Sequence, residues 1–209
     1  MATTLAGLIG AWFIFVLTAS ALGVFISGPA QPPLPMLVAI VGPPAVFVLA
    51  YRLSRRFRES VLDFDLHLLT AVQTWRVLGG VFLALYAFGL LPGLFAWPAG
   101  LGDVGVGVAA VFVLYAMIVG RPNWRRQVWW LNVAGLLDFG GAIGTGVLTS
   151  NSAFGLFAPD VPMAEIGALP LSLIPTFAVP LWIIVHMISL LQLRHGAAAM
   201  TVAPKAEAA

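Results

Sequence analysis

Long apolar runs are the feature that most constrains this chain. Several stretches of about 20 residues contain no charged side chain or only one, and this is the length that an α-helix needs to cross a bilayer. Inside lipid the backbone N–H and C=O groups have to bond to one another, which a helix achieves within one segment. Only 9% of the residues are charged, against about 25% in a typical soluble domain. The pattern predicts an all-α, multi-pass membrane protein.

Six apolar segments predict a bundle of six transmembrane helices. They cover residues 5–26, 35–53, 68–91, 101–119, 128–148 and 169–193. We expect residues 1–195 to form one transmembrane domain and residues 196–209, which are small and polar, to form a flexible cytoplasmic tail. The first segment could instead be a signal peptide cleaved after Ala21. No basic residue precedes this run and it continues through Ile26, which favours a retained span.

The basic residues predict the orientation of the bundle. They follow the second, fourth and sixth segments, at Arg52, Arg55, Arg56, Arg58, Arg121, Arg125, Arg126, Arg194 and Lys205. The loops 28–34, 92–100 and 150–168 contain no Lys or Arg. The positive-inside rule then places both termini in the cytoplasm. Basic residues that report orientation in this way do not indicate a nucleic-acid surface.

Prolines lie inside two of the predicted spans. Pro43 and Pro44 follow Gly42 near the centre of the second, and Pro175 and Pro180 lie in the sixth. A proline within a helix removes a backbone donor and collides with the preceding turn, so we expect both spans to be kinked. A broken helix that lines a substrate site and a static kink that improves packing both remain open.

Ionisable side chains within the spans mark a buried polar cluster. Arg76, Asp138 and His186 lie inside their segments, and Gln73 lies one turn from Arg76. Each charge would be costly in lipid, so we expect these groups to face the bundle interior. At 1.5 Å per residue, Arg76 and Asp138 lie at similar depths, about 12 and 15 Å from one edge, which predicts that they pair. Asp103 is expected nearer the outer surface, as an outer-side acid.

Glycines share the faces of these charged residues and predict close helix packing. Gly79 and Gly80 lie one turn beyond Arg76, and Gly107 lies one turn beyond Asp103. The fifth span adds Gly140 and Gly144, whose spacing of four is typical of touching membrane helices.

Cofactor and metal motifs are weak in this sequence. The absence of cysteine excludes disulfides and thiolate ligands. The three histidines could suggest haem, but axial ligation normally needs two imidazoles that face each other at one depth. Because His67 and His195 do not lie well inside a span, haem is possible but unsupported. The run from Asp63 to His67 reads more simply as a helix cap at Asp65 than as a metal site. We therefore predict no cofactor and no metal.

Three segments resemble an uncharacterised group of small bacterial multi-span inner-membrane proteins. They are Trp75-Arg76-Val77-Leu78-Gly79, the run LLPGLFAWPAGLGD that ends at Asp103, and the run LPLSLIPTFAVPL that ends at Leu181. The resemblance brings no assigned activity. It implies a location in the bacterial cytoplasmic membrane.

Three functions are compatible with these features. The first is a small permease or channel-like protein with a polar path at Arg76, Asp138 and His186. The second is a structural or accessory subunit whose buried polar groups only fix the helix register. The third is an intramembrane redox or lipid-modifying enzyme that uses His186, although the sequence favours a protein that is not an enzyme. The expected partners are the lipid bilayer and further subunits, identical or different, rather than nucleic acid.

Reporter fusions test the topology. Fusions after Arg58, Arg126 and Gly196 should report a cytoplasmic position, and fusions within residues 92–100 and 150–168 should report the outer side, because every short basic loop is expected to stay inside. A cytoplasmic signal from residues 150–168 would contradict the six-span topology.

Overall fold

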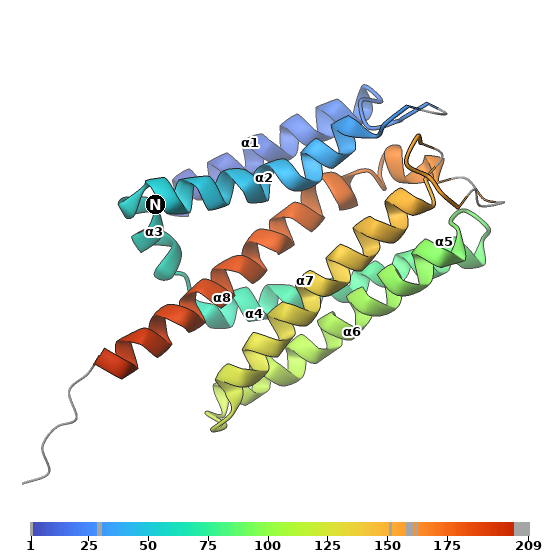
Figure 1. The fold of residues 1–209 in the computed structure, drawn as a ribbon. Helices are drawn as coiled ribbons and strands as arrows, with labels where there is room; N and C mark the ends of the chain where they lie inside the picture. The colour runs from blue at the N-terminus through green and yellow to red at the C-terminus, as the bar shows by residue number, and fades with distance from the viewer. Residues whose placement is uncertain (1, 29–30, 151, 158–160, 162, 203–209) are drawn as a thin grey trace, which may run out of the picture.

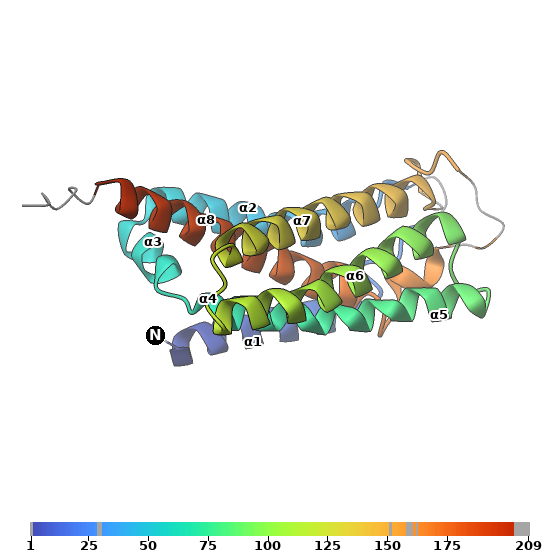
Figure 2. The ribbon, with the colours of Figure 1, turned by 90° about the horizontal axis from the view of Figure 1, so that it is seen from below.

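The computed structural model describes the chain except for residues 1, 29–30, 151, 158–160, 162 and 203–209, and its long elements are α-helices (Figure 1). The elements, in chain order, are α1 (Ala2–Ala21), α2 (Leu34–Leu53), α3 (Arg55–Leu62), α4 (Leu66–Val72), η1 (Gln73–Gly80), α5 (Val81–Ala87), α6 (Gly93–Ile118), α7 (Trp124–Leu148), η2 (Ala164–Gly167), η3 (Ile174–Ala178) and α8 (Val179–Val202). Figures 1 and 2 show α4, η1 and α5 as one rod beside α6. The prediction of an all-helical chain is confirmed for the described residues.

Five helical segments of the described chain are long and apolar enough to cross a membrane. They are α2, the α4–η1–α5 rod, α6, α7 and the segment Ile174–Gly196. Apolar side chains cover the outside of the bundle, as at Phe15, Phe112 and Leu137, which are 70%, 68% and 71% exposed. Soluble proteins avoid such large apolar surfaces, whereas lipid favours them. The apolar part of α1, Leu5–Ala21, is shorter than the five other segments, so the sixth crossing stays a prediction.

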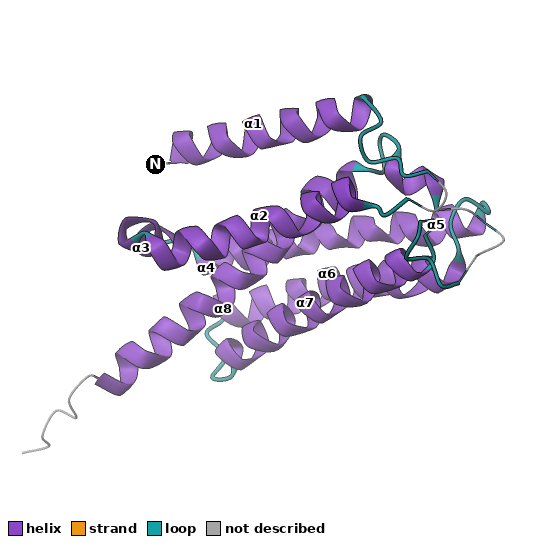
Figure 3. Cartoon of the chain, turned by 45° about the horizontal axis from the view of Figure 1, so that its top comes forward, coloured by secondary structure: helices purple, strands orange, loops and turns teal. Residues whose placement is uncertain are grey.

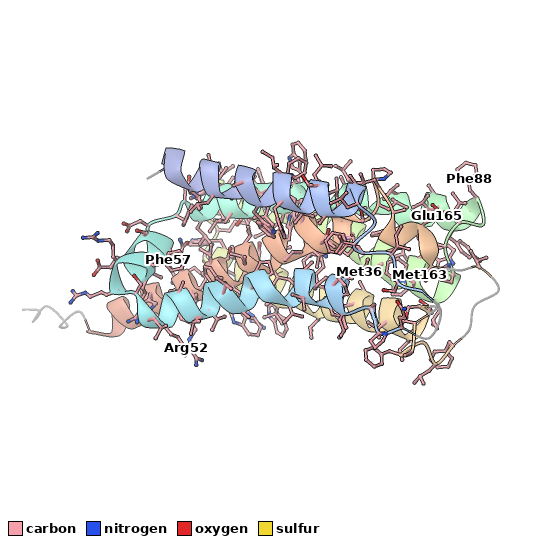
Figure 4. The ribbon with its side chains drawn as sticks, turned by 90° about the horizontal axis from the view of Figure 1, so that it is seen from above. Met36, Arg52, Phe57, Phe88, Met163 and Glu165 are labelled. Carbon is pink, nitrogen blue, oxygen red and sulfur yellow. The ribbon has the colours of Figure 1, made fainter. Side chains whose placement is uncertain are left out.

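The two ends of the bundle differ in charge. One end, named here the basic end, carries α3 and the arginines at positions 52–58, 121–126 and 194. The base-free end carries the α1–α2, α5–α6 and α7–η2 connections, which contain no Lys or Arg. Figure 3 shows that α1 begins and α8 ends toward the side that carries α3. Figure 4 shows Arg52 and Phe57 at one end and Phe88 and Glu165 at the other.

Helix α6 begins earlier than the sequence predicts. Residues 92–100 were expected to form a loop between two spans, yet α6 starts at Gly93 and continues through Pro98. Phe95, Ala96 and Ala99 are buried against neighbouring apolar residues. Packing of this apolar face outweighs the low helix propensity of glycine and proline. The expected start of this span at residue 101 is therefore wrong, and Asp103 lies inside the span.

The third span is not a uniform α-helix. Asp65 caps the start of α4 by accepting a hydrogen bond from the amide of His67, as the sequence predicted. The same bond lowers the pKa of the Asp65 carboxyl group, because it stabilises the charged form. The rod then narrows into the 3₁₀-helix η1, which contains Arg76. Such segments within longer helices mark strain or a hinge, and no sequence pattern predicted this one.

Prolines affect the two predicted helices differently. α2 is one continuous α-helix through Pro43 and Pro44, and the kink expected there stays a prediction. A membrane helix can open locally around a proline without ending. The sixth span does change its geometry: η3, a π-helix that contains Pro175, precedes α8, and Pro180 is the second residue of α8.

The glycines and the C-terminal residues show two further differences from expectation. In the described part of the chain, nothing from another element lies within 4 Å of the positions that Cβ atoms would occupy at Gly140 and Gly144, so their predicted packing inside the bundle is wrong. Gly140 instead faces outward. The expected tail begins at Gly196, but α8 remains helical to Val202, and residues 203–209 lie outside the described part.

Gly107 brings α6 against the 3₁₀-helix and offers a test of this packing. A Cβ atom at Gly107 would lie 2.6 Å from the backbone nitrogen of Val77, which cannot rotate away. We expect Gly107→Ala to lower the free energy of unfolding by about 1–3 kcal/mol, measured by denaturant titration of the purified protein in detergent. Gly105→Ala is the matched control, since nothing lies within 4 Å of its Cβ position. Equal effects of the two substitutions would contradict the close approach of α6 and η1.

Candidate functional site

Arg76 lies at the centre of the bundle and uses all its donors. Its Nε donates to Oδ1 of Asp103 at 2.8 Å, and its Nη2 lies 2.7 Å from the same oxygen. Nη2 also donates to Oδ2 of Asp138. Nη1 donates to the carbonyl oxygen of Gly135 at 3.4 Å and contacts Nε2 of His186 at 3.1 Å. The five N–H groups of the guanidinium therefore meet acceptors from α6, α7 and α8.

Asp103 is a principal partner of Arg76 rather than an acid at the outer surface. The sequence matched Arg76 with Asp138 by depth, and the structure places these two in contact. It also brings Asp103 to the same nitrogen, because α6 starts at Gly93. Counted from Gly93 at 1.5 Å per residue, Asp103 lies about 15 Å inside the bundle. Sequence reasoning missed this depth because it did not recognise that residues 93–102, just before Asp103, already belong to the helix.

His186 connects the cluster to two amides. Its Nε2 accepts from the charged guanidinium of Arg76, so the ring proton has to be on Nδ1. Nδ1 lies 2.8 Å from Oδ1 of Asn132, which accepts this proton. Sequence reasoning missed Asn132, although its position six residues before Asp138 in an apolar helix was visible. A neutral His186 thus orients Asn132 on one side and accepts from Arg76 on the other.

Gln73 completes the inner side of the site. Its Nε2 lies 3.3 Å from Nδ1 of His186 and the side chain is fully buried, while its Oε1 has no hydrogen-bond partner among the described residues. Gln73, Arg76, Asp103, Asn132, Asp138 and His186 are named here the polar cluster.

Phe139 closes one face of Arg76. The Cζ atom of Arg76 lies 3.9 Å from the centre of the Phe139 ring, and this ring meets the imidazole of His186 edge to face at 5.9 Å between centroids. An aromatic face attracts a cation, and more so without water. Phe139 therefore stabilises the guanidinium while keeping water from one side of it.

The charges of the polar cluster do not cancel. Arg76 carries one positive charge, His186 is neutral in this hydrogen-bond pattern, and Asp103 and Asp138 are two carboxyl groups. Two ionised carboxylates would leave the cluster with one net negative charge. A second cation or a proton would balance it, and balance matters at a depth where charges are poorly solvated.

A cavity of about 360 Å³ reaches the polar cluster from the base-free end. Asp103 and Phe139 lie at its deep end, and Ser27, Ser150 and Ser152 line it near the connections. Its walls come mainly from the first half of α2, the second half of α7, and η3. Figure 4 shows Met36 and Met163, which also line it, close together near this end. His186 is not among the described residues that line the cavity.

The other candidate residues lie apart from this site. His67 bonds to Asp65, and Nε2 of His195 lies 3.2 Å from the hydroxyl oxygen of Tyr51. Pro175 lines the cavity, whereas Pro43 and Pro44 do not.

Substitutions in the polar cluster test its energetics. Arg76→Leu should lower the free energy of unfolding by about 3–5 kcal/mol, because two buried carboxylates lose their partner. Asp103→Leu should cost more than Asp138→Leu, since Asp103 accepts from two nitrogens. Combining Arg76→Leu with Asp103→Leu should recover part of the loss, measured as a double-mutant cycle by denaturant titration in detergent. Strictly additive losses would contradict direct coupling.

Comparison with known proteins places the chain in a family without assigning an activity. No curated protein and no solved structure matches it. One family model, described as a domain of unknown function (DUF8737), matches residues 33–194. The match begins at α2 and therefore omits α1, and it includes every residue of the polar cluster. Because the match spans more than half of the chain, this protein belongs to the DUF8737 family.

Proposed function

We propose that the protein is a small permease of a bacterial cytoplasmic membrane, and that the cavity is its solute site. One observation carries the proposal: the cavity ends on Asp103, the carboxylate that holds Arg76. A solute at the deep end of the cavity would touch a member of the polar cluster. Its binding can therefore change the ion pairs that connect α6, α7 and η1.

Buried side chains on the basic-end side of the cavity support a closed barrier toward that end. Gln73, Asn132 and His186 are almost completely buried, and so is Ser189, one turn further along α8. The cavity does not extend to Ser189. Access from one end only is the arrangement expected of a transporter in one of its two states, with the binding site near mid-depth.

Two irregular helices border this site and supply the places where the bundle can move. η1 carries Arg76, and η3 contributes Ile174 and Pro175 to the cavity wall. A 3₁₀ or π segment can exchange hydrogen-bond partners at lower cost than a regular α-helix. Movement at η1 and η3 would open the basic end while closing the base-free end. The positive-inside rule would place the basic end in the cytoplasm, so that the cavity opens outward.

A second candidate, an accessory subunit, is favoured by an outward stripe on α7. Nothing lies within 4 Å of the Cβ positions of Gly140, Gly141 and Gly144. Glycines at this spacing let another membrane helix approach closely. A subunit with this role alone would need no water-accessible cavity, which separates it from a permease.

Cysteine labelling tests the permease, because the chain contains no native cysteine. Gly146→Cys places a thiol in the cavity wall with only ordinary contact to Phe95. Leu137→Cys, on the lipid-facing side of α7, is the control. We expect a membrane-impermeant thiol reagent to modify Gly146→Cys from the base-free side and to leave Leu137→Cys unmodified, because only a hydrated thiol forms the reactive thiolate.

Ser189→Cys separates a permease from a closed binding protein. This near-isosteric substitution places a thiol beyond the barrier. The thiol should not react with the reagent added from the base-free side. In inside-out vesicles it should react slowly, because the basic end opens only part of the time. An inert Gly146→Cys would contradict the accessible cavity and favour the accessory role. A reactive Gly146→Cys combined with a Ser189→Cys inert from both sides would contradict transport.

A further inference from the structure

We propose that the cavity binds an organic cation, an ammonium group attached to an apolar body, with the ammonium group beside Asp103. This inference rests on the proposed function, because it names the class of solute for the same cavity. It depends on the charge of the polar cluster, the nature of the cavity walls and the position of Asp103 between them.

The charge of the polar cluster favours a cation. Arg76 is shared by Asp103 and Asp138, and its five N–H groups are already used. Oδ2 of Asp103 accepts no hydrogen bond from the described residues, and Asp103 lines the cavity. An ammonium group placed there would neutralise the excess negative charge and would not compete with Arg76 for its oxygen. An anionic head group would instead meet the carboxylate of Asp103.

The walls of the cavity favour an organic cation over a metal ion. A hard metal cation needs about six oxygen ligands, whereas most residues around this cavity are apolar. Phe82, Phe95 and Phe139 line the cavity, and the rings of Phe82 and Phe95 meet at 5.3 Å between centroids. Aromatic rings stabilise ammonium groups, particularly where water is excluded. One carboxylate in a cavity lined by phenylalanine rings therefore matches an alkylated ammonium.

The remaining wall suits an apolar body of variable shape. Met36 and Met163 lie near each other at the base-free end, where Figure 4 shows them, and Leu37, Ile40 and Ile143 continue the lining. Methionine side chains adapt to different shapes through three rotatable bonds. The charged end of the ligand would thus be fixed by Asp103, and the apolar end held loosely between α2 and α7.

Charge selectivity of cysteine modification tests this proposal in the membrane. The thiol at Gly146→Cys is exposed to two methanethiosulfonates, one carrying a trimethylammonium group and the other a sulfonate. Phe88→Cys, an exposed position at the base-free end, corrects for their different intrinsic rates. After this correction, the cationic reagent should react about tenfold faster at Gly146→Cys, because a cleft of one charge concentrates its counter-ion.

Three acid substitutions identify the source of this preference. In the Gly146→Cys background, Asp103→Asn should abolish it while keeping an oxygen acceptor for Arg76. Asp138→Asn removes the excess charge without altering the cavity lining, so it should reduce the preference for the cationic reagent. This variant provides a second test if Asp103→Asn does not fold. Glu165→Gln is the matched control: it removes an exposed acid at the same end, outside the cavity lining, and should leave the preference unchanged.

Protection by a matched pair of ligands tests the occupant directly. Phenyltrimethylammonium should slow the modification of Gly146→Cys by neutral iodoacetamide, and tert-butylbenzene, which has the same shape without the charge, should protect at least about tenfold less well. Equal reaction with both charged reagents and equal protection by both ligands would overturn the cation proposal and leave the permease intact. Failure of all reagents to reach Gly146→Cys would overturn the permease itself. A preference that survives both Asp103→Asn and Asp138→Asn would also overturn the cation proposal.

Discussion

An arginine among apolar helices cannot lose its proton, so the bundle has to supply acceptors for five N–H groups. Arg76 obtains them from two carboxylates, one backbone carbonyl and one imidazole, which come from three different helices. Those helices cannot slide or rotate independently without breaking charge-assisted bonds in a medium of low dielectric constant. The register of α6, α7 and α8 around η1 therefore depends on this one side chain.

Close packing and the polar cluster depend on each other. Gly107 allows α6 to approach the backbone at Val77, and Gly79 lies directly against the side chain of Asp103. Gly135 leaves space that Arg76 and His186 occupy, since a Cβ atom there would collide with both. The small residues are thus required by the ion pairs as much as by van der Waals packing. This explains why glycines and charges share the same helix faces.

The cavity gives the polar cluster a role beyond stability. A cluster that only fixed the helix register could be enclosed on every side, yet Asp103 lines a space bordered by η3 and aromatic rings. Its two acids and one arginine leave a charge that a ligand or a proton can balance. The proposals for a permease and for an organic cation both derive from this combination of an apolar space with an unbalanced charge at its deep end.

The sequence by itself determined the class of the protein, because long apolar runs can satisfy their backbone only as helices in a membrane. It also identified Arg76, Asp138, His186 and Gln73 as interior groups, because charge in lipid is costly. It misplaced Asp103, since the burial of Phe95 and Ala99 extends α6 through residues that read locally as a loop. Only the tertiary structure decided that two acids share one arginine and that a cavity reaches them, because both depend on contacts among helices that are distant along the chain.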